Sequence, residues 1–195
     1  MRETFRAMLV LVAVLFFGAA EFCSGRNTSF SCIEREREAL LKFKLCFRDP
    51  SHMLSSWKGN ECCEWRGVDC DKNSGYVVSL QLRGPISDQL YWYKQPQLYL
   101  MDDVEEVVSS LLKLSYLEHL DLSNNNFSGN LIPPSFGLMK QLRYLNLSNV
   151  QFRGRIPNEF GNLTRLHVLD LSQYYYGGFK VNNDIQWISC LSFLQ

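Results

Sequence analysis

The sequence has no excess of charge of either sign. Its 195 residues include 20 Lys and Arg against 20 Asp and Glu, so the formal net charge is zero. Proteins that bind nucleic acid usually carry a strong basic excess, and proteins of the membrane surface carry basic clusters. The balance argues against both kinds of partner. Apolar residues make up 46% of the chain, which excludes a disordered chain of low hydrophobicity.

Motifs of catalysis and metal binding are also missing. The 3 histidines lie far apart, and Gly-x-Ser-x-Gly, His-Glu-x-x-His and Gly-x-Gly-x-x-Gly do not occur. The sequence therefore predicts no enzyme, no cofactor and no metal site, and a hydrolase is the disfavoured alternative. Three tyrosines at 174–176 are not accompanied by a basic groove, so they do not indicate nucleic-acid binding.

Long apolar runs are absent except near the N-terminus. Arg2 and Arg6 precede an uncharged, mostly apolar run at 7–20 that ends in small residues. The run is shorter than the roughly 20 residues that span a bilayer. This pattern is typical of a secretory signal peptide, here residues 1–25 with cleavage between 20 and 25. The sequence predicts an exported mature chain with no membrane span.

Cysteines, in contrast, are plentiful, and in an exported chain they favour disulfides. Cys62 and Cys63 are adjacent, unlike the spaced pairs of zinc sites, and neighbours rarely bridge one another. We predict two disulfides among Cys32, Cys62, Cys63 and Cys70, with the pairing open. Cys23, Cys46 and Cys190 have no evident partner.

Residues 26–75 are predicted to form an N-terminal cap. Ser31 and Glu34 have the spacing of a helix capping box, and Asp49-Pro50 is a stop signal. Between them one helical stripe is apolar: Ile33, Leu40, Phe43 and Phe47. The alternating glutamates and arginines of 34–38 are interpreted as a solvated helix face rather than a carboxylate cluster for acid–base chemistry. With Trp57 and Trp65 nearby, this segment is predicted to cover the end of a larger structure.

Residues 76–195 repeat themselves. The pattern Leu-x-x-Leu-x-Leu occurs in three full copies, in which Leu120, Leu145 and Leu169 hold the same position. A degenerate copy begins at Val77, and an incomplete one begins at Leu191. The leucines point inward from period-2 strands, and stacked coils pair these strands in parallel.

Other positions of the repeat have equally defined roles. Asn125 is expected to hydrogen-bond the backbone of adjacent coils, Phe127 and Phe152 to stack as an apolar spine, and Gly129 and Gly154 to allow the turn. Val150 and Tyr174 replace the asparagine, so those coils lose its hydrogen bond unless a neighbour substitutes.

The copies resemble the plant extracellular leucine-rich repeat, and the segment from Cys32 to Cys70 resembles that family's N-terminal cap. The stretch 77–191 is similar to receptor-like proteins of the ethylene-inducing-xylanase receptor type. The resemblance implies an α/β repeat, a right-handed solenoid with a parallel sheet on its concave face and loops and short 3₁₀ turns on its convex face. It also implies the disulfide pairs Cys32–Cys62 and Cys63–Cys70.

The resemblance further implies a function. The chain would be a non-catalytic extracellular binding module, the N-terminal part of a receptor-like protein acting in defence or development. Its partners would be a protein, peptide or cell-wall-derived ligand and a possible co-receptor. It would lie in the apoplast, or at the plasma membrane where a longer form carries a transmembrane helix, since the family normally continues for many repeats. A secreted inhibitor, similar to the polygalacturonase-inhibiting proteins, is the alternative.

Two surfaces are candidates for ligand contact. The first comprises the strand residues expected to face the solvent on the concave side: Ser79, Gln81, Arg83, His119, Asp121, Ser123, Tyr144, Asn146, Ser148, Val168, Asp170 and Ser172. Tyr144 is the best single candidate, because a rigid aromatic gives large contact area. The second is an insertion at 84–107 that carries Tyr91, Trp92, Tyr93 and Tyr99, which could instead be a locally packed excursion. N-glycosylation sequons stand at Asn27, Asn126, Asn146 and Asn162.

Overall fold

A computed structural model describes residues 31–85, 98–173 and 186–194. The predicted signal peptide, the sequon at Asn27, the aromatic run 91–93 and the substituted position Tyr174 lie outside the described residues. In the described part of the chain, no helix is both long and apolar enough to cross a membrane.

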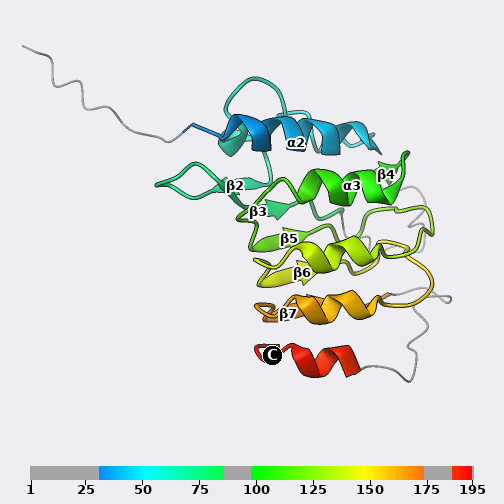
Figure 1. Cartoon of the computed structure of the whole chain (residues 1–195). Helices are drawn as coiled ribbons and strands as arrows, with labels where there is room; N and C mark the ends of the chain where they lie inside the picture. Colours follow the sequence, from blue (N-terminus) through cyan, green and yellow to red (C-terminus); the bar gives the residue numbers. More distant parts are fainter. Residues whose placement is uncertain (1–30, 86–97, 174–185, 195) are drawn as a thin grey trace, which may run out of the picture.

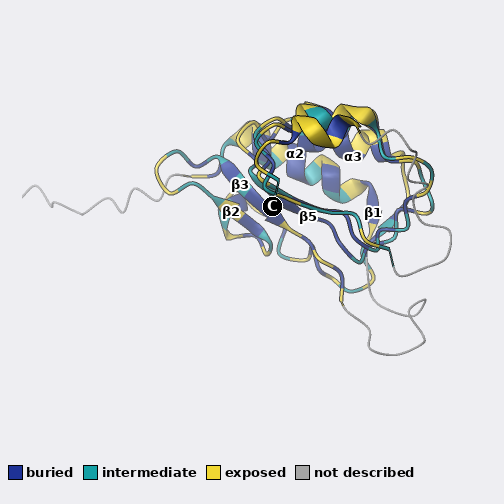
Figure 2. Ribbon diagram, turned by 90° about the horizontal axis from the view of Figure 1, so that it is seen from below, coloured by how far each residue is buried: buried dark blue, intermediate teal, exposed yellow. Residues whose placement is uncertain are grey.

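The chain forms short strands on one side and helices on the other, coil after coil (Figure 1). The strands are β1 (Phe47–Arg48), β2 (Val68–Cys70), β3 (Val77–Gln81), β4 (Tyr99–Leu100), β5 (His119–Asp121), β6 (Tyr144–Asn146) and β7 (Val168–Asp170). The helices are α2 (Glu34–Leu45) and α3 (Val104–Leu111), and the 3₁₀ turns are η1 (Cys62–Glu64), η3 (Pro134–Leu138), η4 (Asn158–Asn162) and η5 (Gln186–Cys190). Buried residues fill the space between the two sides (Figure 2).

The main sheet has the order β2-β3-β5-β6-β7. β2 and β3 form an antiparallel hairpin, and the pairs from β3 to β7 are parallel. Leu80, Leu120, Leu145 and Leu169 lie side by side in this register. The predicted leucine-rich-repeat solenoid, with parallel strands and 3₁₀ turns on opposite sides, is confirmed. A second, antiparallel pair joins β1 to β4.

The hydrogen bonds predicted for Asn125 and the predicted apolar spine are also confirmed. The buried Asn125 donates from Nδ2 to the carbonyls of Leu82 in the preceding coil (2.7 Å) and Leu122 in its own (2.9 Å), and it accepts the Leu98 N–H (3.0 Å). Phe127 lies between Phe47 of the cap and Phe152, with ring centroids 5.6 and 4.9 Å away. The spine therefore joins the cap to the repeats.

In the coil in which Tyr174 replaces the asparagine, the neighbouring residue Gln173 makes the hydrogen bond to the preceding coil. Gln173 donates from Nε2 to the Leu147 carbonyl at 3.2 Å. That carbonyl stands in the preceding coil, as the Leu82 carbonyl does for Asn125. The longer glutamine side chain, one position earlier, reaches the same kind of acceptor. At the other substituted position Val150 is simply buried.

The start of α2 differs from the prediction. Ile33 is the N-cap and no side chain caps the helix, so the capping box of Ser31 and Glu34 is wrong. Ser31 instead donates from Oγ to Glu61, 30 residues later. The helix ends at Leu45, before the predicted stop, because Phe47 leaves the helical stripe to pair with Leu100 in the β1–β4 pair.

Glu36 contradicts the prediction of a solvated face. Its side chain is fully buried, and its carboxylate accepts the backbone N–H of Val77 at 2.7 Å and of Ser115 at 3.3 Å. Burial raises the pKa of this carboxyl, and the two N–H donors oppose the rise. Glu36 thus links the cap helix to β3 and to the following coil.

Part of the insertion is a packed helix. Residues Val104, Val107, Val108 and Leu111 have the spacing of an apolar helical face, and all four are buried. Asp103 caps α3 by accepting the Glu105 N–H. The convex side of this coil is therefore an α-helix rather than the short 3₁₀ turn that the resemblance implies. Residues 98–107 are a packed excursion.

Candidate functional site

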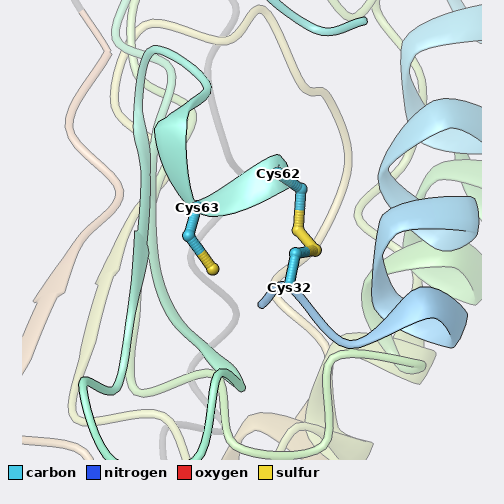
Figure 3. A group of neighbouring side chains, drawn as sticks. All are labelled: Cys32, Cys62 and Cys63. Atoms are coloured by element: carbon cyan, nitrogen blue, oxygen red, sulfur yellow. A yellow bond between two sulfur atoms is a disulfide. The ribbon is translucent and has the colours of Figure 1, made fainter. Parts of the chain in front are cut away.

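Three cysteine sulfurs gather in the cap. Sγ atoms of Cys32, Cys62 and Cys63 lie within 4.8 Å of one another (Figure 3). In the structure Cys32 is bonded to Cys62, and Cys63 to Cys70, which is the pairing that the resemblance implies. Sulfurs held in disulfides offer no thiolate to a metal, so this cluster fastens the cap. Cys46 is a buried free thiol, and burial raises its pKa.

The predicted ligand-facing residues form rows across the parallel strands. The first row is Ser79, His119, Tyr144 and Val168, and the second is Gln81, Asp121, Asn146 and Asp170. The third row lies two residues after the second row in each coil and comprises Arg83, Ser123, Ser148 and Ser172. We call these three rows the concave rows. The structure therefore brings together all twelve residues.

The expectation that all of them face solvent is wrong. Five are buried: Ser79, Asp121, Ser123, Asn146 and Ser148. The side chains of the second row turn back onto their own strands, where Oδ1 of Asp121, Asn146 and Asp170 each accepts the N–H two residues later at 2.9 Å. These three residues close the ends of their strands; Asp121 and Asn146 are buried and Asp170 is half-buried.

Two aromatic rings dominate the first row. His119 and Tyr144 are stacked with centroids 4.1 Å apart and planes at 5°. The Tyr144 hydroxyl accepts a hydrogen bond from Nδ2 of Asn146 at 3.2 Å, which holds the ring. Burial lowers the pKa of His119, while the carboxylates of Asp121 and Asp69 oppose that shift.

Asp69 is a further residue of this surface, and its place in the cap segment of the sequence gave no indication of that. The β2–β3 hairpin pairs Asp69 with Ser79, and Oδ2 of Asp69 accepts from Nε2 of Gln81 at 3.2 Å. This exposed carboxylate extends the concave rows by one strand. The alternating residues of β2 before a Gly75 turn were the available signal for a hairpin.

The sequons differ in accessibility. Asn162 is exposed at the end of η4, on the convex side. Asn146 is buried, with its side chain in hydrogen bonds to Tyr144 and Ser148, so the outward orientation predicted for it is wrong. Asn126 is half-buried and accepts the Ser128 N–H.

We expect glycosylation at Asn162 and not at Asn146 in the folded, exported protein. A glycan on Nδ2 of Asn146 replaces one of its two amide hydrogens and needs open space, whereas this side chain is buried and hydrogen-bonded. Peptide mass spectrometry of protein secreted from plant cells measures the occupancy of both. High occupancy at Asn146 with a native circular dichroism spectrum would contradict this prediction.

These features define a leucine-rich-repeat protein with an N-terminal cap. The leucine-rich-repeat N-terminal domain family matches residues 33–71, and the leucine-rich-repeat family matches residues 116–139 and 141–163. The crystal structure of the BIR2 ectodomain from Arabidopsis thaliana is similar, with a TM-score of 0.63 and 26% identity over 82% of this chain and 76% of that one.

Curated relatives narrow the class. Receptor-like protein EIX1 of Solanum lycopersicum is 36% identical over 97% of this chain, and receptor-like protein EIX2 of the same plant is 40% identical over 80%. The chain is thus similar to the N-terminal part of plant leucine-rich-repeat receptor-like proteins. It spans 18% and 15% of the length of these two relatives. This similarity supports the interpretation that the chain is not an enzyme.

Proposed function

We propose that this chain is a non-catalytic extracellular binding module, the N-terminal part of a plant receptor-like protein that acts in defence or development. Its ligand is a protein, a peptide or a cell-wall fragment, and a co-receptor completes the signalling complex. Residues 1–25 are the signal peptide, 26–75 the cap and 76–195 the repeats. The module works in the apoplast, at the plasma membrane when a longer form supplies an anchor.

The observation that carries the proposal is the stacked pair of His119 and Tyr144 on a rigid parallel sheet. A ring held by stacking and by the hydrogen bond from Asn146 loses little entropy when a ligand packs against it. The neighbouring side chains of Gln81, Arg83 and Ser172 are exposed. The three concave rows thus combine a fixed aromatic centre with a polar rim, as binding surfaces do.

The test is the binding of the whole chain to a panel of secreted plant proteins, peptides and cell-wall oligosaccharides. We expect Tyr144→Ala to weaken the bound partner by about 2 kcal/mol or more, as at binding hot spots. Leu138→Ala is the matched control, since Leu138 is an exposed apolar residue of η3 on the convex side. A partner that is lost in the Leu138 variant and retained in the Tyr144 variant would contradict the proposal. Inhibition of a cell-wall hydrolase by the chain would support the alternative, a secreted inhibitor.

A further inference from the structure

Two neighbouring coils differ on the helical side of the solenoid. The α-helix α3 precedes β5, whereas the shorter 3₁₀ turn η3 precedes β6 (Figure 1). A 3₁₀ turn is narrower than an α-helix, so the two elements do not close against each other as two like turns do. The turns η3 and η4 pack closely, while α3 and η3 touch at fewer positions. A pocket of about 190 Å³ lies between the C-terminal ends of α3 and η3, and we call it the convex pocket.

The floor of the convex pocket is apolar. Four of the side chains that line it are apolar and buried: Leu111, Leu114, Leu117 and Met139. A cavity of about 150 Å³ with Leu, Ile and Phe walls holds one benzene ring, so a pocket of about 190 Å³ suits one ring with a short substituent. The thioether of Met139 favours an aromatic ring, because sulfur makes favourable contacts with ring edges.

Cationic side chains surround the mouth of the pocket. Lys140 lines it and is exposed, and its ammonium has no hydrogen-bond or ion-pair partner among the described residues. Two guanidinium groups bind polar lining residues. Arg35 donates to Oγ of Ser115 at 3.2 Å, and on the other wall Arg165 donates to Oε1 of Gln141. None of the described residues that line the pocket is acidic.

Two carboxylates near the mouth are engaged elsewhere. Glu36 accepts the Ser115 N–H and is fully buried beneath the surface. Glu118, which follows the lining residue Leu117, pairs with Nε of Arg143 at 3.2 Å. The uncompensated charge at the mouth is therefore positive, and it favours an anionic group in a ligand.

We propose that the convex pocket binds a small aromatic monocarboxylate, with its ring on the leucine floor beside Met139 and its carboxylate paired with the Lys140 ammonium. The lysine supplies a charge-assisted hydrogen bond, and the guanidinium groups held at Ser115 and Gln141 add positive potential. The site goes beyond the proposed function, because it lies on the helical side rather than on the concave rows and takes a small molecule.

The probe is phenylacetate, added to the whole folded chain at low salt, and phenylacetamide is the uncharged control with the same ring. Methyl NMR signals of methionine locate the bound ring, since Met139 lines the pocket while Met101 is exposed beside β4. We expect a saturable shift of the Met139 signal, no shift of the Met101 signal, and about tenfold weaker binding of the amide.

Variants separate the charge from the apolar floor. Lys140→Gln removes the charge at the mouth, so it should weaken phenylacetate about tenfold and leave the amide unchanged. Leu112→Ala, at a half-buried lining position, should weaken both probes equally, because it removes apolar wall. Lys72→Gln, at an exposed lysine between β2 and β3, is the matched control and should change neither.

A Met139 signal that stays in place as phenylacetate is added, equal binding of the amide, or unchanged affinity in the Lys140 variant would overturn the inference. The proposed function fails separately. Its test records partners that depend on Tyr144, whereas this one records an organic anion beside Met139.

Discussion

Replacing Asn125 with alanine should lower the free energy of unfolding by about 3 kcal/mol or more, since each buried polar group left without a partner costs about 1–3 kcal/mol. The asparagine amide serves the Leu82 and Leu122 carbonyls and the Leu98 N–H, and its side chain is fully buried. Alanine leaves these groups in a space that excludes water. Urea unfolding followed by circular dichroism measures the change.

Gln173→Ala is the comparison for Asn125. Gln173 is half-buried and its shorter bond is the 3.2 Å contact to the Leu147 carbonyl. Water can reach such a carbonyl in part, so we expect a loss of only about 1 kcal/mol. Equal losses of unfolding free energy in the two variants would show that Asn125 stabilises this solenoid no more than Gln173 does.

Glu36→Ala should cost about 2–4 kcal/mol, because it leaves two backbone N–H groups, of Val77 and Ser115, without their acceptor. Glu36→Gln keeps one acceptor oxygen and should cost less. Glu38→Gln changes an exposed residue of the same helix and should leave the midpoint of unfolding in place. A Glu36→Ala midpoint equal to that of the Glu38 variant would refute the role of Glu36 as the link between cap and repeats.

Glu36 also predicts a pH dependence. Burial raises its pKa in the folded state above the ordinary value of 4.5. The folded state therefore holds the proton more strongly than the unfolded state, and this contribution to stability is present below pH 4.5 and is lost as pH rises through the folded-state pKa. Compared with Glu36→Gln, the natural protein should lose stability between about pH 4 and neutral pH. A constant difference between the two proteins across this range would rule out the raised pKa.

The repeat was predictable because each coil repeats one physical requirement. Leu120 and Leu145 mark strands that cannot bury their leucines alone, so a stacked solenoid is the arrangement that satisfies every copy. The same logic predicted the bonds of Asn125 and the contact of Phe127 with Phe152. Helix α3 could also have been predicted, because the spacing of Val104, Val107 and Leu111 after Asp103 is typical of a helix. The interpretation of 84–107 as an insertion divided this pattern.

Individual side chains at the surface were harder to predict. Glu36 resembles its exposed neighbour Glu38 in sequence, and only the packing of α2 against the first coils separates them. Asp121 and Asn146 occupy outward positions of their strands, yet both are buried, and each accepts the backbone N–H two residues later. The alternation of residues along a strand predicts the side of the sheet on which a side chain lies, whereas its burial depends on tertiary packing.

The sequence by itself determined the class of this protein: a capped leucine-rich-repeat solenoid, whose register follows from leucines that must all point the same way. The tertiary structure decided which polar residues are free to meet a partner. It brought Asp69 from the cap hairpin beside Ser79, and it stacked His119 on Tyr144, residues 25 positions apart in the chain. These contacts arise between coils, where distance in space is set by the parallel register of the sheet and not by distance along the chain.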